Sequence, residues 1–253
     1  MPPIHDFIIR SAQPSDFKRI CDFYLAHNSP ALPAPSAKIV GDTIADGKIL
    51  IVEPAHGGAL VASGAIFELS PKTAVAYVGE LAGMRATREV GGLKPITMQM
   101  TLLGLRLLGH VAGSAIPARS GMTNSIIAIV KSDNQASIKN VEHIGMRRLL
   151  NRPDWFEYDE QLWNGAIIAD DWNHYYADAG TIERALSLLW PVGLPTGTIE
   201  LQRVDKGSQQ LEQFRFVLEL PDIKVALREF ENFRKTGAGI ELLPPPLTLT
   251  FRA

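Results

Sequence analysis

The stretch LAGMRATREVGGLKP, residues 81–95, decides how this chain is interpreted. Its first part is apolar and predicts the end of a strand over residues 74–85. The Gly91-Gly92 pair predicts a turn, and Pro95 suits the first turn of a following helix, where its missing N–H is not needed. Such a turn presents free N–H groups and the positive end of the helix dipole to an anion. Taken alone, the same glycine pair is also typical of an ordinary strand-to-helix turn.

A second informative stretch is IIAIVKSDNQASIKNVEHIGM, residues 126–146. Residues 126–130 are all apolar and predict a short buried strand. Residues 135–144 predict a helix, and Gly145 suits the position just after a helix, because glycine adopts the left-handed conformation there without a steric penalty. Strand, Asn134 and helix therefore follow one another closely.

The other elements follow from local patterns. The predicted order is strand 7–10, helix 15–26 with Pro14 at its start, helix 37–46, and strands 48–53 and 58–68 around a turn at residues 56–58. This order resembles that of the GNAT superfamily of acetyl-CoA-dependent N-acetyltransferases. The resemblance implies an α/β fold of the α+β type, with a mixed, largely antiparallel sheet flanked by helices. A C-terminal α/β extension would follow it.

Three pieces of sequence carry this resemblance. The opening of the chain is similar to that of the family at Ile9, Arg10, Ala12, Asp16 and Ile20. The second piece of the family pattern is a strand followed by Arg/Gln-x-x-Gly-x-Gly/Ala. The third piece is a strand followed by an Asn, a small residue three positions after the Asn, a Gly eleven positions after it, and then an apolar residue. The matching residues are Arg88, Gly91, Asn134, Ser137, Gly145 and Met146, whereas Leu93 stands in place of the last Gly or Ala.

The resemblance implies a coenzyme A thioester, most simply acetyl-CoA, as the acyl donor. Its pantetheine arm would hydrogen-bond to the backbone of one strand, and its pyrophosphate would lie at the glycine turn. Arg88 could add a charge-assisted contact. The implied cofactor-binding residues are Gly83, Met84, Arg85, Arg88, Glu89, Val90, Gly91, Gly92, Leu93, Asn134 and Ser137.

Acylation of an amine requires a base, because the attacking nitrogen must be neutral. Glu80, at the strand that resembles the family's, is the first candidate, and Glu68 is the second. The family often uses a Tyr seven residues after the Asn as general acid, but that position is Val141 here. His143 is two residues further on, which places it about 200° around a helix. The general acid is left unassigned.

Bulk properties narrow the setting. The 253 residues are 46% hydrophobic and 21% charged, with a net charge of −2, as in a soluble globular protein without a global attraction to nucleic acid or to a membrane. Cys21 is the only cysteine, and a cytoplasmic location is expected. The apolar region 96–116 predicts a buried helix rather than a membrane span. Asp170, Asp171 and His174 match no metal motif, so no metal is expected.

We predict a GNAT-like acyl-CoA-binding core over residues 1–152 and a C-terminal extension over residues 153–253. The extension contains all four tryptophans, and it is assigned to acceptor binding or dimerisation. Pro30, Pro33 and Pro35 predict an extended loop, and the resemblance to the GNAT superfamily implies that this loop borders the acceptor side.

The predicted function is transfer of an acyl group, most simply acetyl, to an amine. A small amine, an amino-acid derivative, a protein and a nucleobase all stay open as acceptors. Two alternatives are a degenerate relative that binds acyl-CoA or a partner without turnover, and an enzyme of this fold with a different donor or different chemistry.

Overall fold

The structure is a computed structural model, and it describes residues 4–29, 34–69, 76–86, 123–150, 172–204 and 209–220, with isolated positions between 228 and 235. In chain order the elements are β1 (Ile4–Ser11), η1 (Pro14–Asp16), α1 (Phe17–Ala26), α2 (Ala37–Ala45), β2 (Ile49–Pro54), β3 (Ala62–Leu69), β4 (Ala76–Ala86), β5 (Thr123–Lys131), α4 (Gln135–His143), β6 (Arg147–Arg148), β7 (Trp172–Tyr176), α5 (Ala179–Leu189), η3 (Leu194–Thr196), β8 (Thr198–Val204) and β9 (Leu211–Glu219).

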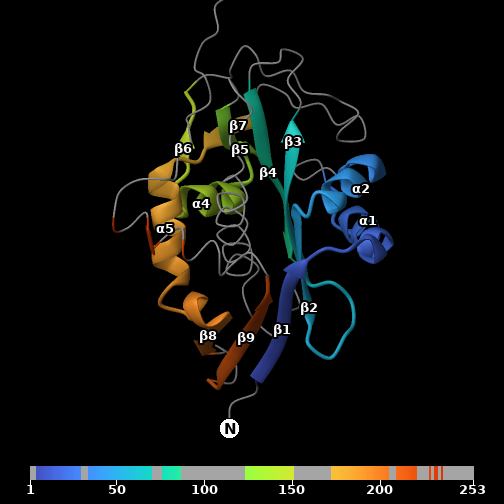
Figure 1. Cartoon of the computed structure of the whole chain (residues 1–253), viewed down its shortest axis with the longest axis vertical. Helices are drawn as coiled ribbons and strands as arrows, with labels where there is room; N and C mark the ends of the chain where they lie inside the picture. Colours follow the sequence, from blue (N-terminus) through green and yellow to red (C-terminus); the bar gives the residue numbers. More distant parts are fainter. Residues whose placement is uncertain are drawn as a thin grey trace, which may run out of the picture.

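All described strands belong to one sheet in the order β6-β7-β5-β4-β3-β2-β1-β9-β8. The neighbouring pairs are antiparallel except β4 with β5 and β1 with β9, which are parallel. Helices α1 and α2 lie on one side of this sheet and α4 and α5 on the other (Figure 1). The predicted fold class, a mixed and largely antiparallel sheet flanked by helices, is therefore confirmed.

The sheet has an apolar core on each face. On β2, Leu50 and Val52 belong to the core shared with α4 and α5, whereas Ile49 and Ile51 belong to the core shared with α1 and α2. All four side chains are buried. This continuous apolar run is what a strand covered on both faces requires, because successive side chains point to opposite faces.

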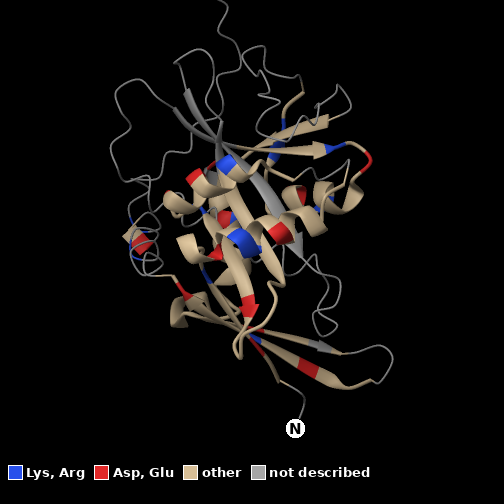
Figure 2. Cartoon of the chain, turned by 90° about the vertical axis from the view of Figure 1, so that its right-hand side faces the viewer, with Lys and Arg blue, Asp and Glu red and all other residues tan. Residues whose placement is uncertain are grey.

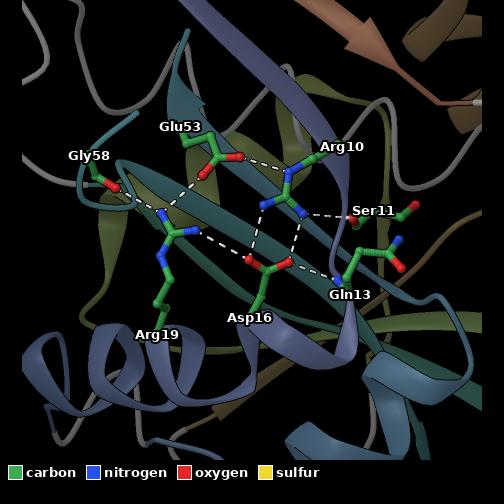
Figure 3. A network of polar contacts seen from close by, with 7 residues as sticks. All are labelled: Arg10, Ser11, Gln13, Asp16, Arg19, Glu53 and Gly58. Atoms are coloured by element: carbon green, nitrogen blue, oxygen red, sulfur yellow. Dashed lines mark hydrogen bonds and ion pairs between the residues drawn. The ribbon is translucent and has the colours of Figure 1, made fainter. Parts of the chain in front are cut away.

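A network of four charged side chains fixes the start of α1 to the sheet (Figure 3). Arg10 of β1 makes two hydrogen bonds to Asp16, of 2.7 and 3.0 Å, and one of 2.7 Å to Glu53 of β2. Arg19 of α1 contacts the same two carboxylates and donates to the carbonyl oxygen of Gly58 at 2.8 Å. Asp16 is buried, and its charge is compensated by both arginines, as a buried carboxylate requires.

These contacts also change the proton affinities of the acids. The hydrogen bond from Arg10 holds the pKa of Asp16 below its usual range. Burial acts to raise the pKa of Glu53, but hydrogen bonds from Arg10 and Arg19 outweigh burial, so that pKa is lowered as well. Hydrogen bonding to the ionised form is one of the general causes of a lowered carboxyl pKa.

Two predicted boundaries can be compared with the structure. The strand predicted from residue 58 begins only at Ala62. The reason is the preceding turn, where Gly57 and Gly58 have φ values of +83° and +133°, outside the range of a strand. Helix α4 ends at His143, one residue before the predicted end, and Gly145 has a φ of +87°, as expected of a glycine just after a helix.

Residues beyond 152 contribute β7, α5, β8 and β9 to the same sheet and core. Arg215 of β9 makes two hydrogen bonds to Asp6 of β1, of 2.8 and 2.9 Å. On the opposite face of these strands, Phe216 stacks on Phe7 with ring centroids 5.3 Å apart. Phe216 is fully buried in the core that also includes α4 and α5. The C-terminal extension thus packs directly on the strand that opens the chain.

Candidate functional site: the opening between β4 and β5

Strands β4 and β5 are paired over only part of their length. Their parallel register runs from Ala76 opposite Thr123 to Glu80 opposite Ile127. Beyond that point, residues 81–86 pair with β3 on their other side, and residues 128–131 pair with β7. Among the residues that the structure describes, these two half-strands make no pairs with one another. Within the described residues each is therefore paired with its outer neighbour alone, and we call the unpaired stretch between their inner edges the opening.

The β4 side of this opening contains a bulge. Ser63 of β3 lies opposite Arg85, but Ala65 lies opposite Ala82. One residue of β3, Gly64, thus faces two residues of β4, Gly83 and Met84. A bulge leaves one residue of the longer strand outside the ladder and bends the strand, and bulges are over-represented beside active sites. The predicted cofactor residues 83–85 therefore lie at an irregular strand edge that borders the opening.

The two candidate bases occupy different positions around this opening. Glu80 is in the last β4–β5 pair, and it lies opposite Phe67 of β3. Glu68 lies opposite Gly79. Because successive strand positions belong to opposite faces, Glu80 lies on the face of α1 and α2, whereas Glu68 lies on the face of α4 and α5. The backbone places both near the opening but on opposite sides of the sheet.

The motif residues that follow β5 have identifiable structural roles. Asn134 caps α4, and its Oδ1 accepts a hydrogen bond of 3.2 Å from the backbone N–H of Ser137. Such a cap satisfies one of the free N–H groups at a helix start. Gly145 ends the helix, and Met146 is buried. The spacing that resembles the family is thus the spacing of a helix with its two caps.

Val141 stands where the family often has a tyrosine, and it is buried in the core of the α4 face. His143 is exposed on the same helix. Tyr175 of β7, for which the sequence predicted no catalytic role, is buried and donates a hydrogen bond of 3.4 Å to Glu142. Burial, together with the charge of Glu142, raises the pKa of Tyr175. Its strand lies on the far side of β5 from the opening, so we do not assign it a role there.

The remaining predicted residues cannot be placed. The proposed phosphate turn, Arg88, Glu89, Val90, Gly91, Gly92 and Leu93, lies outside the described residues. The same holds for the helix predicted over 95–110, for Pro30 and Pro33, and for Asp170 and Asp171. The side chains of Glu68, Glu80, Met84 and Arg85 are likewise outside the description, which covers only their backbone.

Charge is distributed evenly over the part of the chain that the structure describes. Figure 2 shows basic and acidic residues interspersed on its helices and strands. Among the described residues, none of the helices has the length and apolar character that crossing a bilayer requires.

Comparison with known proteins finds similarity at the level of structure. No protein family and no curated protein matches the sequence. Solved structures that match include a GNAT-family acetyltransferase from Listeria monocytogenes, with 14% identity and a TM-score of 0.44 over 68% of this chain and 94% of the other. An Arabidopsis thaliana protein in complex with a bisubstrate analogue of coenzyme A matches with 13% identity and a TM-score of 0.44 over 67% and 95% of the two chains.

A third match is the ribosomal-protein-S5-alanine acetyltransferase of Vibrio fischeri, with 12% identity and a TM-score of 0.43 over 66% of this chain and 89% of the other. Many of the solved structures to which this chain is similar are therefore GNAT-family acetyltransferases.

Proposed function

We propose that this chain transfers an acyl group, acetyl in the simplest case, from coenzyme A to an amine. The observation that carries the proposal is the opening between β4 and β5, which begins at Glu80 and has the bulge at Gly83–Met84 on its rim. An extended ligand with amide groups can add itself to such a strand edge through main-chain hydrogen bonds. The pantetheine arm of coenzyme A is a ligand of this kind.

The donor would be bound in three places. The arm runs along residues 83–85 of β4, where a backbone N–H freed by the bulge donates to the thioester carbonyl oxygen. Asn134 and Ser137 lie near the distal part of the arm. The pyrophosphate is held by the turn at residues 88–93, where glycines allow close approach of the backbone and Arg88 adds a charge-assisted contact.

The chemical step forms one bond and breaks one. The neutral amine nitrogen attacks the thioester carbonyl carbon, and the carbon–sulfur bond then breaks to release the thiolate of coenzyme A. The nitrogen loses a proton to a carboxylate, either directly or through a water molecule. We assign this role to Glu80, whose backbone lies in the last pair before the strands separate.

Departure of the thiolate depends less on acid catalysis than attack by the amine depends on base catalysis. A thiolate has a modest proton affinity and can leave without a dedicated acid, so Val141 in place of a tyrosine is compatible with turnover. The acceptor would enter from the side of α1, α2 and the loop that follows α1. We place the reaction in the cytoplasm, in keeping with a chain that has one cysteine.

Binding of the donor is tested by thermal denaturation with and without acetyl-CoA. A ligand that binds only the native state raises the melting temperature. Gly91→Glu should abolish the rise, because it puts bulk and negative charge at the pyrophosphate. The matched control is Leu150→Glu, which adds the same charge at a position that is 95% exposed. If the rise survives in a folded Gly91→Glu protein, the phosphate turn is misassigned.

Turnover is tested by the release of free thiol from acetyl-CoA in the presence of a panel of amines. The panel should contain small amines, amino-acid derivatives, N-terminal peptides and nucleosides with an exocyclic amine. Amine-dependent thiol release identifies the acceptor class. A second candidate function, binding of acyl-CoA without turnover, is favoured by the buried Val141. It would be established by a melting-temperature rise without thiol release for any amine.

A further inference from the structure

A buried pair of hydroxyl groups lies directly behind the β4 bulge. The Tyr24 hydroxyl of α1 and the Oγ of Ser63 of β3 are 2.9 Å apart, and either can donate the hydrogen bond. Tyr24 is 1% exposed and Ser63 is 0% exposed. Tyr24 belongs to the core that α1 and α2 share with the sheet, and Ile20, Ile51 and Ala65 are members of the same core.

The position of Ser63 in the ladder gives this contact its significance. Ser63 is the last regular partner on one side of the bulge, opposite Arg85, and register resumes with Ala65 opposite Ala82. A bulge locally disrupts the ladder, so the strand there is held by fewer main-chain bonds than elsewhere. On its other side this part of β4 has no β5 partner among the described residues. The location of the bulge therefore depends on how firmly β3 is fixed.

Two paired hydroxyls that are almost completely buried need a physical reason. A buried hydrogen bond contributes little net stability compared with apolar groups of the same shape, whereas removing one partner leaves the other hydroxyl unsatisfied. An all-apolar contact would hold α1 on the sheet equally well, but without direction. A hydrogen bond fixes the separation and orientation of the two groups. Tyr24 and Ser63 thus fix one point of α1 to one point of β3.

We propose that Tyr24 is a positioning residue: through Ser63 it fixes β3 behind the bulge at Gly83–Met84 and so determines how accurately the bulge N–H meets the acyl carbonyl of the donor. The ligand in this inference rests on the proposed function, whereas the constraint that Tyr24 places on β3 does not depend on it. The same helix leads into the loop after α1, where Asn28 accepts a hydrogen bond of 2.8 Å from the backbone N–H of Ala34. Tyr24 therefore links the proposed acceptor side of the molecule with the proposed acyl site.

The test compares Tyr24→Phe, Ser63→Ala and the double variant with a matched control. The control is Thr181→Val, which also removes a hydroxyl that is 0% exposed and donates a hydrogen bond of 3.0 Å, here to the carbonyl oxygen of Gly145. It leaves β3 and β4 untouched. The double variant guards against misfolding, because replacing both partners by apolar groups can be nearly neutral for stability.

The first readout is amide hydrogen exchange of the peptide that covers residues 78–86 in the free protein. We expect exchange to be about three- to tenfold faster in all three test variants, which corresponds to losing the constraint of roughly one hydrogen bond, and unchanged in Thr181→Val. Equal exchange in Tyr24→Phe and Thr181→Val would overturn the proposal. This readout does not depend on the protein's activity.

The second readout is the ratio of the dissociation constants of coenzyme A and acetyl-CoA, which isolates the contact with the acyl group. We expect wild-type protein to prefer acetyl-CoA and Tyr24→Phe to lose about three- to tenfold of that preference, while Thr181→Val retains it. An unchanged ratio in Tyr24→Phe would also overturn the proposal. Wild-type protein that binds neither compound would instead refute the proposed function and leave the exchange result to decide the positioning role.

Discussion

Among single residues, Glu80 and Glu68 offer a matched pair, because the two positions differ chiefly in the face of the sheet to which they belong. Glu80→Gln should lower turnover about 10²–10⁴-fold if Glu80 is the general base, since a positioned base typically contributes that much. Steady-state thiol release with the best amine of the panel measures this. Acetyl-CoA affinity should be unchanged.

Glu68→Gln is the control for this experiment, and it should turn over at close to the wild-type rate. The assignment fails if the two variants exchange their effects, or if Glu80→Gln keeps its activity across the pH range. Either result would move the role of base to Glu68 or to water.

The charged network around Asp16 predicts how stability depends on pH. In the folded state the pKa of Asp16 is lowered from its usual value of 3.8, and the pKa of Glu53 is lowered from its usual value of 4.5. The stabilisation is therefore fully present above those usual values and is lost as the pH falls through the lowered folded-state values. Urea unfolding between pH 7 and pH 3 should show this decline in the free energy of unfolding.

Asp16→Asn tests the origin of that decline. The variant should be less stable than wild type at pH 7, because it removes one of the two carboxylates that Arg10 and Arg19 share, and the difference should shrink toward pH 3. A difference that stays constant over the whole pH range would show that the ionised carboxylate is not the source.

For single residues, features that depend on neighbouring positions could be predicted from the sequence, whereas contacts between distant segments could not. Gly145 as a helix end and Asn134 at a helix start could be predicted, because their signals lie within a few residues of the helix. The partnership of Arg10 with Glu53 could not, because 43 residues separate them and only the pairing of β1 with β2 brings them together. The bulge at Gly83–Met84 could not be predicted for the same reason, because a bulge depends on how two strands pair.

Among the elements, the connection between α5 and β8 depends on one glycine. Gly193 has a φ of +112°, and a Cβ there would overlap the carbonyl oxygen of Thr198. Gly193→Ala should therefore force the turn apart and lower the melting temperature by about 4 °C or more, on a scale of roughly 2–4 °C per kcal/mol for a chain of this size.

Gly197→Ala is the matched control for that experiment, because its φ is +75° but a Cβ would meet nothing within 4 Å. It should show only the backbone strain of a left-handed alanine, about 1–2 kcal/mol. Differential scanning calorimetry of both variants makes the comparison. Equal losses would mean that the contact with Thr198 contributes nothing.

Helix α5 was not predicted, although its sequence contains a usable signal. Ile182, Ala185, Leu186 and Leu189 recur at the spacing of one helical face and are all buried. Asp178 and Thr181 form reciprocal capping hydrogen bonds at its start. The tryptophans and tyrosines around it are the more conspicuous feature of the segment, and they do not by themselves indicate a helix. Strand β6 has two residues and no pattern to detect.

For the molecule as a whole, the C-terminal extension contributes to the apolar core on the α4 and α5 face of the sheet. Truncation after Leu150 would remove the strand that pairs with β1 and the buried rings of Phe214 and Phe216. It would also remove α5 and uncover the face on which α5 packs. We expect the shortened chain to be insoluble, as judged by sedimentation after expression, because a large apolar surface becomes exposed. A soluble fragment that binds acetyl-CoA would show that residues 1–150 fold alone.

The general architecture could be predicted better than the way in which the C-terminal strands join the sheet. The order of strands and helices up to residue 146 indicated a sheet with helices on both faces, and that expectation is confirmed. The return of β9 to lie parallel to β1 could not be inferred, because no local pattern specifies a partner about 200 residues away. The division into residues 1–152 and 153–253 stays a prediction, as does the role of the extension in acceptor binding or dimerisation.

Amide hydrogen exchange with and without saturating acetyl-CoA shows whether an acyl-CoA binds in the opening between β4 and β5. We expect slower exchange in peptides that cover residues 81–86 and 128–137, with little change in β8 and β9, because a ligand paired with a strand edge protects its amides. Binding that protects other segments and leaves residues 81–86 unchanged would contradict the claim, as would the absence of any binding by folded protein.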